Sequence, residues 1–197
     1  MTLPYVPASG QGIVIRRANL GEVETVLESV RNLAAASATA AHWSRVVWHP
    51  YLAPDVASSV LQAKALLLAV AHSDVGGTTK IDGENPPATR ERILGFAAFS
   101  TIMAVDAGES TLENMVVAKP WQRQGIGWRL LTAGQLWCRA HASRTVFLEV
   151  RKSNRTAIAL YQQAGFSVVG SRPGYYRDPT EDGLQMQKWL GLAARAC

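Results

Sequence analysis

The spacing of hydrophobic residues along the chain changes between a helical and a strand-like period. Apolar residues at helical spacing follow Asn19 and run to Leu33, and Asn19 with Glu22 is expected to form a capping box. Further helices are predicted over 43–52 (or an aromatic-anchored loop), 125–142 and 156–164, with a helical turn over 58–64. Apolar runs predict strands over 13–16, 66–72, 93–104, 110–118, 145–151, 166–171 and 183–190.

These elements follow the order β-α-α-β-β-β-α-β-α-β-β. Helices between strands in the second half favour parallel pairing there, whereas the first half is expected to be antiparallel. The pattern predicts a mixed α/β fold whose twisted sheet has six to seven strands and about four flanking helices. Gly95, inside one predicted strand, indicates a bulge or a close approach of backbones.

Residues 73–92 connect two predicted strands and lack hydrophobic periodicity. They are rich in Gly, Pro, Asp and Thr, so the segment is either disordered or functional. Neither side of it makes a complete fold alone. We therefore expect one domain over 1–197 with a flexible insertion at 73–92.

The composition narrows the class of protein. Of the 197 residues 48% are hydrophobic and 18% charged, which fits a globular chain with a sizeable core. Met1–Gly12 has no apolar run typical of a signal peptide, and the longest apolar stretch, 65–71, is too short to span a bilayer. These features predict a soluble, cytoplasmic protein with no membrane partner.

The charged residues, cysteines and histidines do not indicate a specific ligand or metal site. The net charge is +5, and the Lys and Arg residues are dispersed, which fits either a solvated surface or an anionic ligand such as a phosphate. Cys138 and Cys197 have neither metal-ligand spacing nor the number needed for a disulfide framework, and the four histidines are scattered. We predict no metal site and no nucleic-acid partner.

A glycine-rich turn lies between a predicted strand and a predicted helix. Gln122-Arg-Gln-Gly-Ile-Gly127 follows the strand that Lys119-Pro120 ends. Backbone N–H groups at a helix N-terminus have no partner inside the helix and favour negative charge, and glycines allow a ligand to approach closely. The turn suits a pyrophosphate, although it matches neither the dinucleotide fingerprint nor a P-loop.

Val117 through Gly127, with its Gln-Arg-Gln-Gly-Ile-Gly core, resembles the coenzyme A motif of the Gcn5-related N-acetyltransferase (GNAT) superfamily. The resemblance implies a GNAT fold and acetyl-CoA as co-substrate. It implies that Met115, Val116 and Val117 line the pantetheine and thioester. It also implies that backbone N–H groups of Arg123, Gln124, Gly125, Ile126, Gly127 and Trp128 hold the pyrophosphate. Many family members carry a basic residue at the position of Trp128.

Two side chains in the second half carry candidate chemistry. Glu149 lies in an apolar strand, where a carboxylate is costly unless it is paired with an arginine, exposed at a cleft or functional. Tyr161, on a helix with Ile158 and Ala164, would by itself be read as a core tyrosine.

The string containing them resembles the ribosomal-protein-alanine N-acetyltransferase (RimI-type) branch of the superfamily. The likeness runs over about 112–189, through Leu148-Glu-Val-Arg-x-Ser-Asn154, Ala157-Ile-Ala-Leu-Tyr161 and Gly165-Phe166. It implies that Glu149 is the base, directly or through a water, that Tyr161 is the acid, and that Asn154 bonds the pantetheine. Arg172, Tyr175 and Tyr176 would fold over the acceptor, although the two tyrosines could instead simply alternate faces of a strand.

The expected reaction is transfer of acetyl from acetyl-CoA to the N-terminal α-amine of a protein, with a ribosomal N-terminal alanine as the first candidate. At pH 7 deprotonation costs about 1.4 kcal/mol for an α-amine and about 4.6 kcal/mol for a lysine. The first 105 residues match the branch only in element order, and of its Pro-Trp-Ser-like segment only Trp43-Ser44 is present. A small-molecule amine acceptor therefore stays open, as do a non-catalytic acyl-CoA-binding module and a nucleic-acid-binding protein. The sequence does not predict the oligomeric state.

Overall fold

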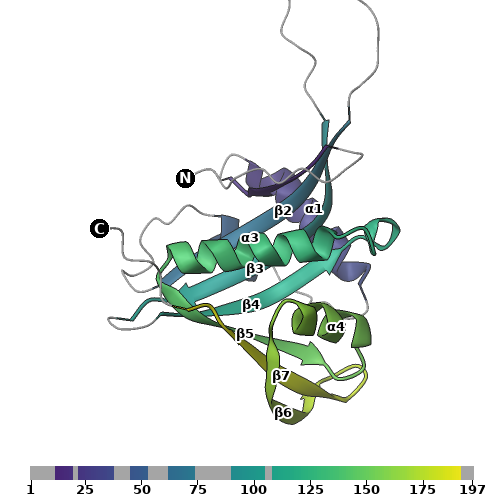
Figure 1. The fold of residues 1–197 in the computed structure, drawn as a ribbon. Helices are drawn as coiled ribbons and strands as arrows, with labels where there is room; N and C mark the ends of the chain where they lie inside the picture. Colours follow the sequence, from purple (N-terminus) through teal and green to yellow (C-terminus); the bar gives the residue numbers. More distant parts are fainter. Residues whose placement is uncertain are drawn as a thin grey trace, which may run out of the picture.

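The computed structural model describes residues 12–19, 22–37, 45–52, 62–73, 90–104 and 108–191. Within them the chain forms seven strands and four α-helices around one sheet (Figure 1). The strands are β1 (Ile13–Arg17), β2 (Gln62–Ser73), β3 (Arg90–Ile102), β4 (Gly108–Val117), β5 (Ser143–Arg151), β6 (Ser167–Tyr176) and β7 (Glu181–Trp189). The helices are α1 (Val23–Ala35), α2 (Arg45–Leu52), the 3₁₀ helix η2 (Lys119–Trp121), α3 (Ile126–Ala140) and α4 (Arg155–Gln163). The predicted element order and mixed sheet are confirmed.

The strands lie in the order β1-β2-β3-β4-β5-β7-β6. The pairs from β1 to β4 are antiparallel, as predicted. Among the described strands, parallel pairing is restricted to β4 with β5. The parallel pairing expected in the second half is therefore confirmed for β4 with β5. It was wrong for β6 and β7, because β7 lies between β5 and β6 and pairs antiparallel with both.

Helices cover both faces of the sheet. In Figure 1, α3 and α4 lie in front of the strands and α1 lies behind them. Along β2 the side chains alternate accordingly: Leu66 and Leu68 join the core under α1 and α2, whereas Ala65 and Leu67 join the core under α3 and α4. Burial on both faces explains why β2 reads as a continuous apolar run.

Several predicted boundaries are corrected. Helix α1 begins at Val23, not beside Asn19: the Glu22 carboxylate accepts from the Asn19 amide at 3.2 Å, but no side chain caps the helix itself. Residues 62–64 of the predicted turn at 58–64 belong to β2. Strand β6 continues to Tyr176, where a connection was expected. The segments 58–61 and 74–89, and Trp43 with Ser44, lie outside the described residues.

The close approach predicted for Gly95 is present. An ideal Cβ on Gly95 would lie 2.7 Å from the Val116 carbonyl oxygen, and the β2–β3 register shifts beside it. This contact brings β3 against the end of β4 that leads into the glycine-rich turn.

Gly134 on α3 lies over the ring of buried Phe99 on β3. A Cβ there would stand 2.0 Å from the Phe99 Cζ atom. We expect Gly134→Ala to lower the free energy of unfolding by about 1–3 kcal/mol, because overpacking outweighs the better helix propensity of alanine. Urea denaturation measures this. Gly12→Ala, where the added Cβ meets nothing within 4 Å, is the control. Unchanged or increased stability of Gly134→Ala would contradict this packing.

Candidate active site

The site forms where β4 and β5 separate. Their parallel pairing ends at Leu112 opposite Leu148, although β4 continues to Val117 and β5 to Arg151. Beyond that point the strands diverge, and two cavities of about 580 and 710 Å³ open on either side of the end of β4. They share Met115, Asn154 and Ala157 in their linings, so the two spaces meet at these residues.

The first cavity is built on the glycine-rich turn. Arg123 (φ 62°) and Gly125 (φ 77°) adopt left-handed backbone conformations, and the Gln122 side-chain amide donates to the Val117 carbonyl at 2.9 Å. The first helical bond runs from the Arg129 amide to the Gly125 carbonyl at 3.0 Å, so the amides of 126–128 precede it. The turn thus presents N–H groups at the start of a fifteen-residue helix, where negative charge is favoured.

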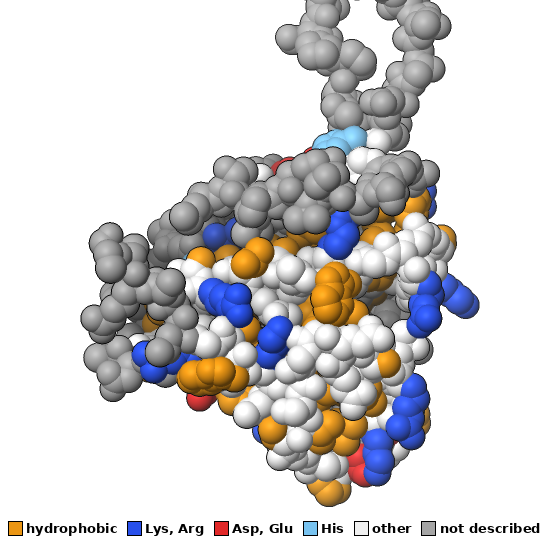
Figure 2. Space-filling model, in the orientation of Figure 1, with side chains coloured by type: hydrophobic (Ala, Val, Ile, Leu, Met, Phe, Trp, Pro, Cys, Tyr) orange, Lys and Arg blue, Asp and Glu red, His pale blue; other side chains and the backbone are white. Residues whose placement is uncertain are grey.

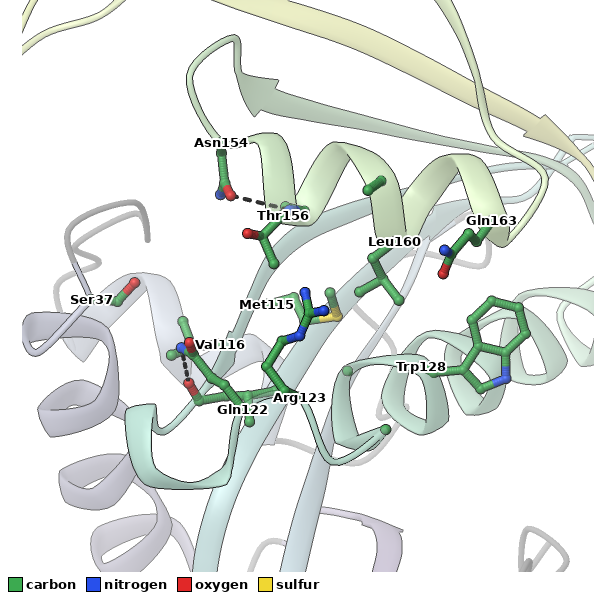
Figure 3. A pocket seen from close by; sticks show the side chains of 15 residues that line it. Ser37, Met115, Val116, Gln122, Arg123, Trp128, Asn154, Thr156, Leu160 and Gln163 are labelled. Carbon is green, nitrogen blue, oxygen red and sulfur yellow. Dashed lines mark hydrogen bonds between the residues drawn. The ribbon is translucent and has the colours of Figure 1, made fainter.

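Helix α4 forms the opposite wall of this cavity (Figure 3). Arg123 extends from the turn toward this wall and, among the described residues, is the one charged side chain in the lining. The lining also contains residues that the sequence did not predict as cofactor-binding: Ser37, Gln122, Thr156, Ala157, Ala159, Leu160 and Gln163. Apart from Gln122, which belongs to the turn itself, these residues come from just after α1 and from α4, which only folding brings to the turn.

Most of the predicted cofactor-binding residues gather in this cavity: Met115, Val116, Val117, Arg123, Gly125, Gly127, Trp128 and Asn154. Two do not line it. The side chain of Gln124 turns away and donates to the Pro120 carbonyl at 3.2 Å, and that of Ile126 is buried in the core. These two residues can therefore contact a bound ligand only through their backbone amides. Asn154 also caps α4, because its Oδ1 accepts from the Ala157 amide at 3.2 Å.

The second cavity contains both predicted catalytic side chains. Glu149 and Tyr161 line it together with Arg172, Tyr175 and Tyr176. The Glu149 side chain is 25% exposed, and its Oε1 lies 3.1 Å from an Arg172 Nη1. Glu149 therefore meets two of the conditions expected of a carboxylate in an apolar strand, because it is ion-paired with an arginine and lines a cleft.

Tyr161 is buried, with 7% of its surface exposed, and its ring packs 5.9 Å from that of Phe166. Burial, followed by the nearby Tyr176, raises the pKa of its hydroxyl above the ordinary value of a phenol. The hydroxyl therefore stays protonated across the physiological pH range. It lines the same cavity as Glu149 and is available there as a hydrogen-bond donor.

Two tyrosines of β6 form one wall of the second cavity. The rings of Tyr175 and Tyr176 meet edge to face at 5.0 Å, and the Arg151 guanidinium lies 4.4 Å from the Tyr176 centroid. A hydrogen bond with Glu149, then partial burial, raises the pKa of Tyr175. Burial and the charge of Glu149 raise that of Tyr176 to about 12. Both phenols are therefore neutral donors beside a carboxylate.

Other side chains in this cavity escaped the sequence analysis. The lining includes Glu109, Thr111, Glu113, Asn114, Val169 and Gln185. Glu113 is the extra residue of a β4 bulge, because the β3 partners Ala98 and Phe99 face Asn114 and Leu112. No sequence signal marks such a bulge.

Cys138 is separate from both cavities. It is fully buried, and burial raises the pKa of its thiol to about 12, which keeps it from acting as a thiolate nucleophile. Among the described residues no three His, Cys, Asp or Glu side chains gather as a metal site would need. No described helix has the length and apolarity to cross a bilayer. Lys and Arg side chains on the face in Figure 2 lie in separate small groups.

Comparison with known proteins decides the family. The model of the "Acetyltransferase (GNAT) family" matches residues 56–166. The chain belongs to the GNAT family. The [ribosomal protein bS18]-alanine N-acetyltransferase of Escherichia coli is 44% identical over 103 residues, covering 48% of this chain and 68% of that protein. The N-alpha-acetyltransferase RimI of Mycobacterium tuberculosis is 34% identical over 99 residues, covering 50% and 61%.

The sequence match covers only part of the length of these relatives. An uncharacterised protein of Mycobacterium leprae is 34% identical over 100 residues, which make up 51% of this GNAT chain but 27% of that protein. The chain thus spans less than two thirds of some of the relatives that it matches.

Solved GNAT structures share the fold over almost the whole chain. The E. coli ribosomal-protein-S18-alanine N-acetyltransferase superposes with a TM-score of 0.61 at 24% identity, covering 94% of this chain and 98% of that one. Arabidopsis thaliana NAA60, solved in complex with acetyl-CoA, gives 0.67 at 16%, covering 90% and 99%. The predicted family, GNAT fold and acetyltransferase class are confirmed. The assignment of individual site residues stays a prediction.

Proposed function

We propose that this GNAT enzyme transfers acetyl from acetyl-CoA to the N-terminal α-amine of a protein, with Glu149 as base and Tyr161 as acid. The observation that carries the proposal is the meeting of two cavities at Met115. One contains an anion-binding turn, and the other contains a carboxylate beside a neutral phenol. We also propose that residues 1–197 form one domain, as the sequence predicted.

The first cavity fits acetyl-CoA. Its N–H groups and Arg123 suit a pyrophosphate, and Gly125 and Gly127 keep the cradle open. A Cβ on Gly125 would meet nothing within 4 Å, so that space is free for a ligand. Met115 to Val117 line the path from the turn to the second cavity, where β4 no longer pairs with β5. Backbone N–H groups there can polarise the thioester carbonyl.

The second cavity supplies the proton transfers. The neutral amine attacks the thioester carbon, and the C–S bond breaks as the tetrahedral intermediate collapses. Glu149, directly or through a water, takes the proton that the nitrogen loses, and Tyr161 donates to the departing sulfur. Solvent then returns a proton to Tyr161 and removes one from Glu149. The balance is one amide and one thiol formed from one thioester and one amine.

Three considerations support an N-terminal acceptor. The E. coli relative, at 44% identity, is named for alanine of ribosomal protein bS18, and the Mycobacterium tuberculosis relative for N-alpha-acetylation. An α-amine costs about 3 kcal/mol less than a lysine to deprotonate at pH 7. In addition, Tyr175 and Tyr176 line the acceptor side as neutral hydrogen-bonding side chains. We propose a ribosomal N-terminal alanine as the first acceptor to try.

An acceptor panel tests this proposal. Thiol release from acetyl-CoA is followed with peptides beginning in Ala, Ser or Met, including an Ala-initiated ribosomal N-terminus, and with polyamines and aminoglycosides. Turnover on the peptides is expected, and the Ala-initiated peptide is expected to react fastest. Turnover confined to the small amines would overturn the peptide assignment while leaving the acetyltransferase class intact.

The pH profile tests the acid. We expect kcat/KM to rise as the acceptor amine loses its proton near pH 8, and then to stay level through about pH 10, where an ordinary tyrosine would ionise. The plateau follows because burial raises the pKa of Tyr161, so its protonated form persists to higher pH. Rates between pH 6 and 10.5 measure this. A fall centred near pH 10 that disappears in Tyr161→Phe would contradict it.

A further inference from the structure

The guanidinium of Arg172 reaches across one strand to touch another. Arg172 is on β6 and Glu149 on β5, and β7 lies between them. On β7 the residue opposite Arg172 is Gly183, and the residue opposite Glu149 is Gln185. The arginine therefore crosses β7 beside a residue that has no side chain and ends next to Gln185.

All three guanidinium nitrogens have acceptors on this sheet. Nη1 contacts Glu149 Oε1 at 3.1 Å. With the Gln185 amide turned so that its oxygen faces Arg172, that oxygen accepts from Nε at 3.2 Å and from Nη2 at 3.3 Å. The guanidinium also lies 5.2 Å from the ring centroid of Tyr175. Because the planar guanidinium is bonded through all three of its nitrogens, its orientation is fixed. A lysine ammonium cannot make the same set of contacts.

Two glycines make room for this arrangement. An ideal Cβ on Gly170 would lie 2.9 Å from the end of the Gln185 side chain, and one on Gly183 would lie 3.1 Å from Tyr175 Cδ1. Larger residues at either position would displace the groups that hold Arg172. The crossing is thus shaped by the backbones of β6 and β7 as well as by the charged pair.

We infer that Arg172 and Gln185 are positioning residues for the base rather than contacts for the acceptor. Arg172 holds Oε1 of Glu149, whose side chain is 25% exposed and lines the cavity where the amine would arrive. This inference rests on the proposed function and changes the role that the sequence resemblance implied for Arg172. Three of the five N–H donors of Arg172 are already engaged by Glu149 and Gln185, so these two side chains fix its orientation before any acceptor arrives.

The inference predicts a specific kinetic pattern. Arg172→Ala lowers kcat about tenfold, as misplacement of a catalytic group does, with the KM values for peptide and acetyl-CoA unchanged within twofold. Arg172→Lys recovers part of the loss, because its ammonium can still reach Glu149 without the fork to Gln185. Gln185→Ala lowers kcat about threefold. Arg139→Ala, an exposed arginine of α3 outside both cavities, is the matched control and keeps wild-type rates.

A double-mutant cycle separates positioning from acceptor binding. If Arg172 acts only through Glu149, then Arg172→Ala changes the residual kcat of Glu149→Gln by less than twofold. An equal rise in peptide KM with Glu149 present and with Glu149→Gln would overturn the inference and make Arg172 an acceptor contact. If Glu149→Gln alone keeps wild-type kcat, the base assignment of the proposed function fails instead. Thermal unfolding of every variant checks that the fold is retained.

Discussion

Glu149→Gln is expected to lower kcat at least 100-fold while leaving the KM for acetyl-CoA within about twofold of wild type. General base catalysis contributes about 10²–10⁴-fold, and an amide cannot take the proton that the attacking nitrogen must lose. The amide keeps the shape of the side chain, and its oxygen can still accept from Arg172. The loss should therefore fall on the chemical step and leave cofactor binding untouched. Steady-state kinetics with saturating acetyl-CoA measures it.

A matched pair of variants sharpens this prediction. Glu28→Gln, an exposed glutamate on α1, makes the same chemical change away from the site and should keep wild-type kcat. Tyr161→Phe retains the buried ring against Phe166 and removes only the hydroxyl, so it should lower kcat by about 10–100-fold. If Glu149→Gln retained more than a third of wild-type kcat, the carboxylate would be structural, as an ion-pair partner of Arg172.

Gly127→Glu is expected to raise the dissociation constant of acetyl-CoA at least 100-fold. Gly127 lines the first cavity at the start of α3, where the N–H groups of the turn favour an anion. A carboxylate there would compete for those groups and repel a pyrophosphate. The nearest heavy atom to the added Cβ is the Leu160 Cδ2 atom at 3.2 Å, the end of a flexible side chain, so the fold should survive. Calorimetric titration with CoA measures binding independently of turnover.

Gly127→Ala separates charge from bulk. It introduces the same Cβ without a carboxylate and should weaken CoA binding by less than tenfold. If the two variants bound CoA equally poorly, steric blockage alone would explain the loss. If Gly127→Glu bound CoA as tightly as wild type, the turn would not be the phosphate site.

The parts of this protein that were predictable from sequence are those encoded in local spacing. The turn 122–127 was predictable because its glycines and the amphipathic helix after them are adjacent in the chain. In the structure Gly125 adopts a left-handed backbone conformation, with φ 77°. The end of α4 was predictable for the same reason, since Gly165 directly follows the helical pattern and takes φ 87°. Glu149 stood out as one carboxylate in an apolar strand, and the structure places it in a cleft.

The parts that were not predictable depend on pairing between distant strands. Strand β6 is mostly exposed, as a sheet edge often is, so its polar residues after 171 gave no strand signal. Its full length follows from pairing with β7, which lies between β5 and β6. The contact of Arg172 with Glu149 depends on that order and on the register that places Gly183 opposite Arg172. Likewise, Thr156 and Gln163 reach the first cavity only because α4 packs opposite the turn.

In the proposed function the two cavities bring an acetyl donor and an α-amine together. The measurement that tests it most directly is mass-spectrometric localisation of the acetyl group on a peptide that begins with Ala and also contains an internal lysine, after incubation with the enzyme and acetyl-CoA. Acetyl is expected on the N-terminal nitrogen, with the lysine unmodified, and Glu149→Gln should give at least 100-fold less product. Acetyl on the lysine alone, or an equal yield with Glu149→Gln, would contradict it.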